Sequence, residues 1–365
     1  MRSRRGAALA VVLVALVVVA ALGAGAALAA RESNRSASDD LARVRAESRA
    51  WGSLEHAVRE WDRRRSVLAV GAVDSGVGAA DPRDVVRVVR LDRTRFLVEA
   101  SARERSAAPG AAGQAERTAS SFVRLAPPTV AALAAITSGG TLSVLDHAAV
   151  DGRDVPPPGW TDCATPTSDT AAVATAAAGA VRPAPQSTIG GALKQHSAAA
   201  DTASYAAFGA DDWATLAVRA DVVVASGPSV PTPRASASTC VLDVDAWSEP
   251  MRGGGAVGAC TTTFPIVVAP NGLALDGGRG QGMLLVNGDL VLNGSVTYAG
   301  VIVVRGALRA DVGALRLHGA LLVQGGGALG AGSLVQFSRC AIERAMDGIA
   351  RASAARRHSW AEVTR

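Results

Sequence analysis

The sequence predicts an α+β chain, mostly β, with a long N-terminal transmembrane helix, a small β meander and then stacked β repeats. Three observations predict this fold class. No charged residue occurs from Gly6 to Ala30, an apolar stripe at helical spacing follows, and short apolar runs closed by glycine recur further along. The 365 residues are enough for one large or two modest domains.

The changes in pattern divide the chain into successive segments. In order, we expect a leader (1–6), a transmembrane segment (7–30), a helix extension (31–66), a small β region (67–136), a β-helix-like domain (137–160 and 261–337) interrupted by a partly irregular insertion (161–260), and a C-terminal helix with a basic tail (338–365).

The N-terminal segment predicts the compartment. Arg2, Arg4 and Arg5 precede the uncharged run, and about 20 apolar residues suffice to cross a bilayer as a helix. Positive charge before the span keeps that end cytoplasmic. We therefore expect a single-pass protein of the cell membrane, with its bulk in the periplasm or outside the cell.

Two modes of processing are compatible with this segment. Ala27-Leu28-Ala29 fits a signal-peptidase site, which would release the protein. Alternatively, cleavage between Gly6 and Ala7 would leave the helix as a permanent anchor. The apolar run is longer than the 7–15 residues typical of a signal peptide, which favours retention of the anchor.

The helix is expected to continue beyond the membrane. Six apolar residues recur on one stripe: Leu41, Val44, Trp51, Leu54, Val58 and Trp61. This spacing predicts a helix of about fifty residues in total, half in lipid and half covering a globular domain. Asp84–Leu91 and Arg95–Ser101 then predict a β-hairpin, with a third strand at Ser120–Leu125.

The region from Phe264 to Gln336 contains a repeat. Its copies are Met283–Gly288, Val301–Gly306 and Ala320–Gly325, and their glycines are separated by 18 and then 19 residues. Apolar strands closed by glycine at this period are typical of stacked parallel β-coils; an antiparallel meander is the alternative. Thr141–Gly152 resembles another coil element. Within the insertion, a helix is expected over Asp211–Val218, and the helix after Ser338 is expected to cap the open end of the stack.

The four cysteines, Cys163, Cys240, Cys260 and Cys340, are widely spaced. In an exported protein they favour one or two disulfides over free buried thiols, and three pairings are possible.

No motif indicates catalysis, and we expect no catalytic residue, cofactor or metal ion. Gly325–Gly330 matches GxGxxG, but no helix opens after it; Gly278–Gly282 lacks the GK[ST] ending of a P-loop. The histidines are scattered without metal-ligand spacing. Nucleic-acid binding is not expected either, since the net charge is only +5 and no basic stripe is interleaved with aromatic residues.

Four carboxylates beside glycine turns were candidates for surface chemistry: Asp151, Asp154, Asp276 and Asp289. Some β-helix enzymes use such acids on glycans. The simpler interpretation is that each hydrogen-bonds its own turn.

Both ends of the chain resemble a known family. The run from Arg5 through Gly6 to Leu13 resembles the N-terminus of PilX-type minor pilins of type IV pilus systems, and Glu55–Val58 resembles the segment that closes their helix. LLVNGDLVLNG and VIVVRGAL resemble the C-terminal part of some large PilX-like proteins. The resemblance implies cleavage after Gly6 by a prepilin peptidase and packing with other pilins or pilus assembly proteins.

One departure from the family bears on the role. Most pilins carry a glutamate five residues into the mature chain, where this sequence has Val11. Its absence removes one tie between subunits, so a tip or initiator role fits better than a major-subunit role. The expected function is that of a non-catalytic, membrane-anchored minor pilin-like protein of a type IV pilus or type II secretion pseudopilus. The alternative is a membrane-anchored β-helix adhesin or polysaccharide-binding module.

Overall fold

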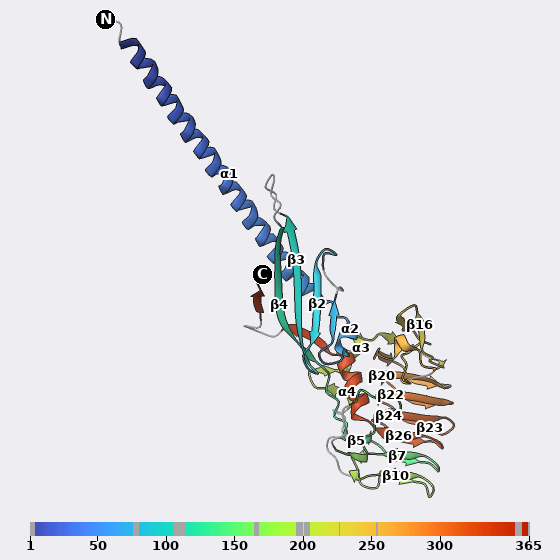
Figure 1. Cartoon of the computed structure of the whole chain (residues 1–365). Helices are drawn as coiled ribbons and strands as arrows, with labels where there is room; N and C mark the ends of the chain where they lie inside the picture. Colours follow the sequence, from blue (N-terminus) through green and yellow to red (C-terminus); the bar gives the residue numbers. More distant parts are fainter. Residues whose placement is uncertain are drawn as a thin grey trace. The chain divides into compact units, whose positions relative to one another are not determined.

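The computed structural model describes residues 4–75, 80–105, 114–163, 168–194, 200, 205–225, 227–252, 255–354 and 360–363 (Figure 1). The chain forms two compact units. The first comprises Met1–Trp61, Val70–Arg124 and Ala352–Arg365, and the second comprises Asp62–Ala69 and Leu125–Arg351.

A single helix of 56 residues, α1 (Arg4–Arg59), opens the first unit. It contains no proline, and its glycines leave the helix unbroken. The long helix predicted from the apolar run and its extension is therefore confirmed, and it ends seven residues before the expected limit at 66.

An antiparallel sheet completes the first unit. Its strands are β1 (Val73–Ser75), β2 (Val85–Arg90), β3 (Arg95–Arg105), β4 (Gln114–Ala126), β27 (Arg351–Ala354) and β28 (Trp360–Val363), in the order β1-β2-β3-β4-β27 with β28 also on β4. The predicted hairpin is β2–β3, and Asp92 Oδ1 closes its turn by accepting hydrogen bonds from the amides of Thr94 and Arg95, both at 2.8 Å. The residues of β2 and β3 alternate between buried and more exposed, so α1 covers one face of the sheet.

Two sheets of parallel strands form most of the second unit. The larger has the order β10-β7-β26-β24-β22-β20-β18-β14, with β5, β8 and β11 attached beside β24, and the smaller has the order β15-β19-β21-β23-β25-β6-β9. In chain order these strands are β5 (Ala134–Ser138), β6 (Leu142–Val144), β7 (Ala149–Asp151), β8 (Ala171–Thr175), β9 (Val181–Pro183), β10 (Thr188–Gly190), β11 (Leu193–Lys194), β14 (Val222–Val223), β15 (Pro228–Ser229), β18 (Ile266–Ala269), β19 (Leu273–Leu275), β20 (Gly278–Val286), β21 (Leu290–Leu292), β22 (Ser295–Val304), β23 (Leu308–Ala310), β24 (Ala314–Val323), β25 (Gly327–Leu329) and β26 (Leu334–Phe337).

Shorter elements lie between these strands. They are α2 (Arg63–Ser66), α3 (Trp213–Val218), the 3₁₀ helix η3 (Gly258–Cys260), α4 (Arg339–Gly348) and the antiparallel pairs β12 (Ala207–Phe208) with β13 (Asp211–Asp212) and β16 (Arg234–Ser236) with β17 (Thr239–Val241). The helix expected near Asp211 is α3, and Asp212 caps it by accepting a hydrogen bond from the amide of Thr215.

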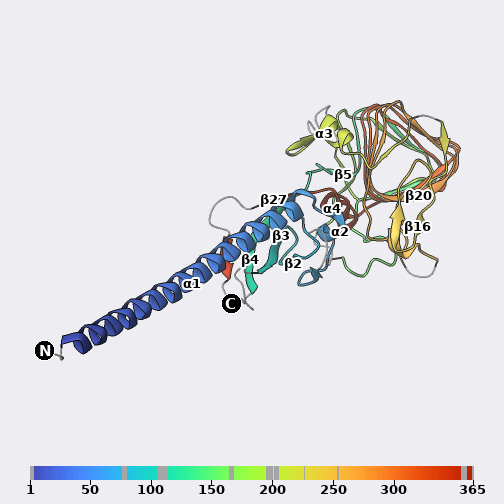
Figure 2. The same ribbon diagram turned by 90° about the horizontal axis from the view of Figure 1, so that it is seen from above.

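The predicted repeats pair in parallel and in register. Leu285 pairs with Val303, which in turn pairs with Leu322, and all three side chains are fully buried. The closing glycines of successive repeats are also hydrogen-bonded to one another. The amide of Gly306 donates to the carbonyl of Gly288, and the amide of Gly325 donates to the carbonyl of Gly306, both at 2.9 Å. The antiparallel meander is therefore excluded, and Figure 2 shows the strands of this unit lying over one another.

The spatial order of the strands differs from their order in the chain. β24, β25 and β26 pair with β5, β6 and β7, so the segment near residue 140 joins the C-terminal repeats as expected. The segment 161–260, expected to be partly irregular, contributes more than anticipated. Its strands β8 to β11 extend the stack beyond β5–β7, and β14 and β15 extend it at the opposite end.

The C-terminal helix does not cap the end of the stack, contrary to the prediction. α4 instead packs across the strands β20, β22 and β24, where a Cβ on Gly300 would lie 3.2 Å from the Cβ of Ala345. Because the interior lies on one side of these strands and α4 on the other, Leu284 and Val286 are buried as well as Leu285. This explains why the repeats read as continuous apolar runs rather than alternating patterns.

Candidate membrane anchor and disulfide sites

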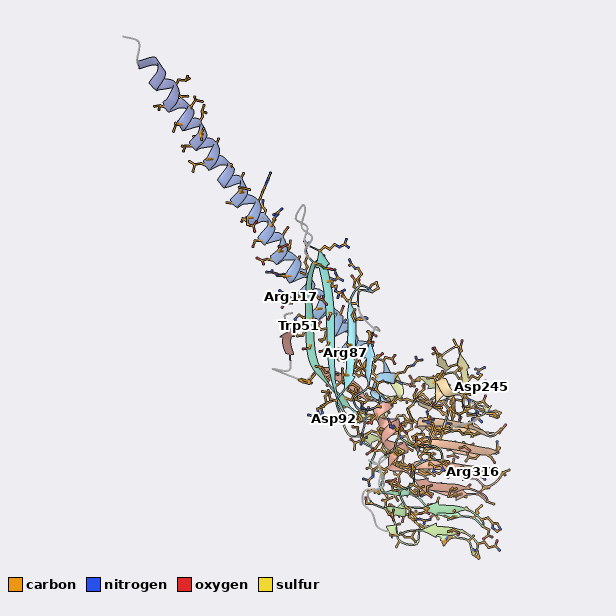
Figure 3. All side chains as sticks on the ribbon, viewed as in Figure 1. Trp51, Arg87, Asp92, Arg117, Asp245 and Arg316 are labelled. Atoms are coloured by element: carbon orange, nitrogen blue, oxygen red, sulfur yellow. A yellow bond between two sulfur atoms is a disulfide. The ribbon has the colours of Figure 1, made fainter. Side chains whose placement is uncertain are left out.

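The N-terminal part of α1 is an exposed apolar rod. Among the described residues, α1 is the one helix long and apolar enough to cross a membrane, with a mean hydropathy of 2.8 over its best window and none of that window buried. Its large apolar side chains from Leu9 to Leu28 are each at least 51% exposed, and Figure 3 shows them clear of the sheet. Gly6 and Ala7 lie in the first turns of α1, and cleavage between them stays a prediction.

The C-terminal part of α1 packs on the sheet through alanine. The fully or almost fully buried residues of this part are Ala42, Ala46, Ala50, Ser53, Leu54 and Ala57. Of the predicted stripe, Leu54 is buried, but Leu41 and Val44 are 48% and 62% exposed, so that prediction is wrong for these two residues. Small side chains allow a helix to approach a sheet closely, and a spacing of three or four residues keeps them on one face.

A polar cluster adds to this contact. The Arg49 guanidinium lies 2.5 Å from Asp84, 2.7 Å from Glu104 and 3.3 Å from Asp81, while Ser53 donates to the other oxygen of Asp84 at 2.8 Å. The Asp84 side chain is only 1% exposed. Because a buried carboxylate without partners is costly, Arg49 and Ser53 fix the position of α1 on the sheet.

Arg83 binds the third carboxylate of this cluster, Asp81. Hydrogen bonds from the Arg83 side chain, and then from the Arg83 backbone amide, lower the pKa of Asp81 far below its usual value, and Arg49 contributes to the lowering. Sequence reasoning did not find Arg49. The available signal was Asp84, which directly precedes an apolar strand.

The four cysteines form two disulfides, and the structure shows which cysteines pair. Cys163 bonds to Cys340 across 177 residues, and Cys240 bonds to Cys260 across 20. The first links the segment before β8 to α4, and the second joins β17 to the 3₁₀ helix η3. The prediction of disulfides over free thiols is confirmed.

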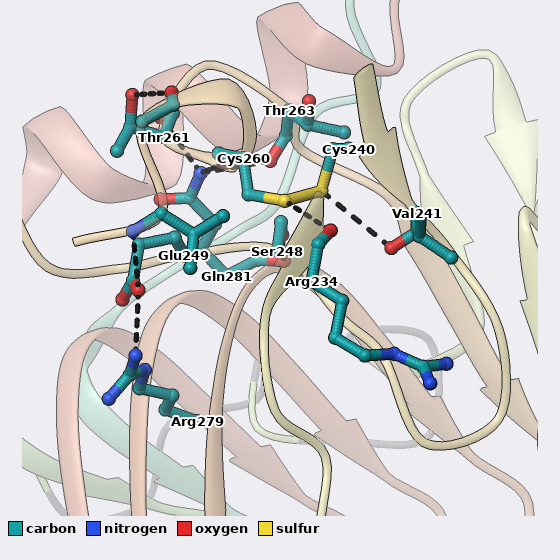
Figure 4. The surroundings of a disulfide bond; sticks show 12 residues. Arg234, Cys240, Val241, Ser248, Glu249, Cys260, Thr261, Thr263, Arg279 and Gln281 are labelled. Atoms are coloured by element: carbon teal, nitrogen blue, oxygen red, sulfur yellow. Dashed lines mark hydrogen bonds and ion pairs between the residues drawn. A yellow bond between two sulfur atoms is a disulfide. The ribbon is translucent and has the colours of Figure 1, made fainter. Parts of the chain in front are cut away.

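The loop closed by Cys240–Cys260 is fastened to the strand β20 (Figure 4). The buried Gln281 side chain donates to the carbonyls of Cys260, Thr261 and Thr263 at 2.8–3.2 Å, and Glu249 forms an ion pair with Arg279 at 3.0 Å. These contacts assign a structural role to the glycine-rich run at Gly278–Gly282.

The glycines of that run and of the GxGxxG match occupy tight positions. Gly282 has a φ of +107°, and a Cβ there would lie 2.4 Å from the Pro265 carbonyl oxygen. A Cβ on Gly327 would lie 2.0 Å from the Leu308 oxygen, and one on Gly330 would lie 1.8 Å from the Ala310 oxygen. Close backbone contact between neighbouring strands therefore accounts for these glycines.

The four candidate carboxylates behave differently from one another. Asp151 accepts from the amide and side chain of Arg153 nearby, as predicted, and these hydrogen bonds lower its pKa. The other three accept hydrogen bonds from residues distant in the sequence. Asp276 accepts from the Asn293 side chain at 2.8 Å, and Asp289 accepts from the amide of Ala307 at 2.9 Å. Asp154 accepts from the amide of Arg339 at 2.9 Å. The turn interpretation is wrong for these three, since they join separate repeats or elements.

No group of three or more His, Cys, Asp or Glu side chains within the described ranges has the geometry of a metal site. No protein-family model matches the chain, and no curated protein matches it. Among solved structures, the chain is similar to the competence-associated pilin ComZ from Thermus thermophilus, with 10% identity over 81% of this chain and 86% of that one, at a TM-score of 0.23. A similarity this low supports no conclusion about fold or function.

Proposed function

We propose that this chain is a membrane-anchored, non-catalytic minor pilin-like protein of a type IV pilus or type II secretion pseudopilus assembly. The observation that carries the proposal is the division of α1. One uninterrupted helix has an exposed apolar half suited to lipid and a half that packs on an antiparallel sheet through buried alanines.

The proposed topology follows from the charges and the disulfides. Arg4 and Arg5 precede the apolar half, so that end would stay cytoplasmic while both units face the outside. Two disulfides fit an oxidising compartment. A prepilin peptidase would cut between Gly6 and Ala7, and Val11 in place of a carboxylate favours a tip or initiator position among other pilins.

We further infer that the second unit is a parallel β-solenoid. The support is the register of its repeats, in which Leu285, Val303 and Leu322 form one buried row across three neighbouring strands. Each repeat buries its inner face only when stacked on its neighbours, so such a unit is a stiff body held outside the membrane by the anchored first unit.

The alternative function, a surface-polysaccharide-binding module, gains no specific support. Sugar-binding surfaces commonly use exposed aromatic rings, which combine a flat apolar face with a polar tip. In the described part of the second unit, Trp160, Trp247, Tyr205 and Tyr298 are each at most 5% exposed. The ring of Trp213 is partly exposed, but the Arg305 guanidinium lies over it at 4.8 Å.

Cross-linking in native membranes tests the proposal. We expect affinity purification of the tagged chain to enrich pilus or pseudopilus subunits and assembly proteins. A control with Val14→Arg and Val18→Arg should lose them, because each arginine at the centre of a span costs about 2.5–3.5 kcal/mol. Recovery of surface polysaccharide without any pilus component would contradict the proposal and favour the alternative.

A further inference from the structure

Four apolar side chains form a row across the sheet of the first unit, on the face that α1 does not cover. Val73 pairs with Val89, and Val89 pairs with Leu97. Leu97 pairs in turn with Phe122, so each of the strands β1 to β4 contributes one residue. Directly paired residues point to the same face of a sheet, and the sequence neighbours of these residues on β2, β3 and β4 are buried on the opposite face. We call these four residues the outer row.

The outer row is open to solvent. Val73 and Phe122, at its two ends, are each 45% exposed, and Leu91 beside it is 42% exposed. Val89 and Leu97 are partly exposed between them. The row crosses four strands, which is about 14 Å at a strand spacing of about 4.8 Å. A contiguous exposed apolar strip, unlike scattered apolar residues, indicates an interaction surface.

The charges on the two sides of the outer row differ. On one side Arg87 pairs with Glu99 at 3.4 Å. On the other side Arg95 and Arg124 lie directly opposite each other on β3 and β4, an arrangement that disfavours like charges. Asp92 forms an ion pair with Arg95, whereas the Arg124 guanidinium has no hydrogen bond or ion pair among the described residues. The outer row therefore has a balanced border near Arg87 and a cationic border beyond it, toward Asp92 (both labelled in Figure 3).

The outer row lies far from the membrane-spanning half of α1. Arg49 lies 2.7 Å from Glu104 near the end of β3, and Trp61, just beyond α1, contacts Phe96 at the start of β3 with ring centroids 5.2 Å apart. α1 therefore runs along β3 (Figure 2), and the outer row is level with its C-terminal end. The helix from residue 30 to residue 59 spans about 43 Å, at a rise of about 1.5 Å per residue. Lipid does not reach the outer row while α1 crosses the membrane.

A second copy of the chain does not fit against the outer row of the first. A two-fold axis parallel to the strands keeps both α1 helices pointing the same way, but it places Arg95 and Arg124 of one copy against the same arginines of the other. An axis parallel to the outer row brings Arg95 opposite Glu99 of the other copy, but the two α1 helices then point in opposite directions and cannot enter one membrane. This step rests on the proposed membrane anchor, whereas the outer row and its cationic border do not.

We propose that the outer row binds a different protein outside the membrane, one whose surface carries an apolar strip bordered by carboxylates. The partner's apolar side chains would cover Leu97 and Phe122, and an aspartate or glutamate beside them would pair with Arg124. Such a carboxylate also relieves the repulsion between Arg95 and Arg124, and a planar guanidinium can bind it through two parallel hydrogen bonds. Burial of the apolar strip would drive association, and the charge at its border would select the partner.

Photo-cross-linking from the outer row in the native cells tests this assignment. The photoreactive analogue p-benzoylphenylalanine replaces Phe122 in the full chain. In the control chain it replaces Val218, an 88% exposed residue of α3. We expect position 122 to give an adduct with one other protein, on a peptide that carries an aspartate or glutamate, and position 218 to give no such adduct.

Charge reversal then tests the cationic border. Arg124→Glu should lower the yield of the adduct at least about tenfold, because like charges at an interface are strongly unfavourable. The Arg124 side chain holds no contact with another described residue, so the variant should fold. Arg182→Glu, which reverses an exposed arginine of β9, is the matched control and should leave the yield unchanged. Replacing the identified carboxylate of the partner protein by arginine should restore the adduct of the Arg124→Glu chain.

Several results would overturn the assignment. An adduct between two copies of this chain, an adduct with lipid, or no adduct from a folded chain in the membrane would show that the outer row does not bind a different protein. An undiminished yield with Arg124→Glu, or no rescue by the reversed partner, would show that the charge does not select the partner. The identity of the partner is read separately: a charge-dependent adduct with a protein outside pilus assemblies would support this inference and count against the proposed function.

Discussion

At the scale of single residues, Arg49 connects α1 to its sheet because its guanidinium lies within 3.3 Å of three carboxylates. Asp84 is the most buried of the three. Among the described residues of the cluster, the Arg49 guanidinium supplies the opposite charge to its carboxylate, and the Ser53 hydroxyl donates to its second oxygen. We therefore expect Arg49 to contribute most to the stability of the contact between α1 and the sheet, although alanines make most of the packing.

We expect Arg49→Ala to destabilise the first unit by roughly 3 kcal/mol, because it leaves the Asp84 carboxylate buried with one neutral partner. Hydrogen exchange of the β2 and β3 amides measures this loss. The matched control is Arg43→Ala, which removes only an exposed pair with Asp40 and should change the stability by less than about 0.5 kcal/mol. Equal effects of the two variants would contradict the assigned role.

A second residue-scale prediction concerns His318 on β24. Burial lowers the pKa of His318 below 6.5, and its Nδ1 atom has no hydrogen-bond partner among the described residues. Since the unfolded chain binds this proton more tightly than the folded chain, the contribution of His318 is fully present above pH 6.5. It is lost as the pH falls through the folded pKa.

The stability of the second unit should therefore decline as the pH falls below about 6.5, and His318→Gln should flatten this part of the profile. Denaturant unfolding followed at several pH values measures the slope. The control is His147→Asn, since position 147 has a φ of +61° that asparagine tolerates. A slope unchanged by His318→Gln would show that other groups cause the pH dependence.

At the scale of elements, the sequence predicted best where apolar residues were large. The runs of Leu, Val and Ile at residues 283–286, 301–304 and 320–323 predicted three strands, their register and their glycine corners. The face of α1 that covers the sheet is mostly alanine, which gives a weak periodic signal, so Leu41 and Val44 were assigned to it wrongly. For the same reason β8 (AAVAT) was not distinguished from an irregular segment.

Other features depend on the spatial order of the strands, which local patterns do not contain. The pairing Cys163–Cys340 follows from the stacking of β24–β26 on β5–β7. The position of α4 across the strands also follows from tertiary packing. The glycines, by contrast, correctly indicated tight corners of the chain. The sequence did not show which backbone atoms of the neighbouring strands lie against each glycine.

The tightest of these glycines provides the prediction for this scale. Gly319 has a φ of +147°, and a Cβ there would lie 1.7 Å from the Gly300 carbonyl oxygen. We expect Gly319→Ala to destabilise the second unit by roughly 3 kcal/mol or more, because both the φ value and the contact oppose a side chain. Gly258→Ala, with nothing within 4 Å, should stay within about 0.5 kcal/mol in the same denaturant titration. A tolerated Gly319→Ala would show that neighbouring strands are not in this close contact.

At the scale of the whole molecule, the chain joins sequence-distant parts by covalent links. Cys163–Cys340 spans 177 residues, whereas Cys240–Cys260 spans 20. A disulfide that closes a longer loop removes more conformational entropy from the unfolded chain. The chain-entropy relation gives about 5 kcal/mol for the first disulfide and about 3 kcal/mol for the second.

Replacing both cysteines of a pair by alanine tests this ranking. We expect the Cys163→Ala/Cys340→Ala variant to melt at a lower temperature than the Cys240→Ala/Cys260→Ala variant, with calorimetry as the readout. The reverse order would indicate that the loop fastened by Gln281 and Glu249 contributes more to the folded state than the entropy of the longer connection does.

The central claim is that α1 is a retained anchor, and the mature N-terminus tests it most directly. N-terminal sequencing of the protein recovered from its native cells should give a chain that begins at Ala7 and stays in the membrane fraction after alkaline extraction. A chain that begins at Ala30 and is found in the soluble fraction would contradict the claim, because the exposed apolar half of α1 would then be a signal peptide that is removed on export.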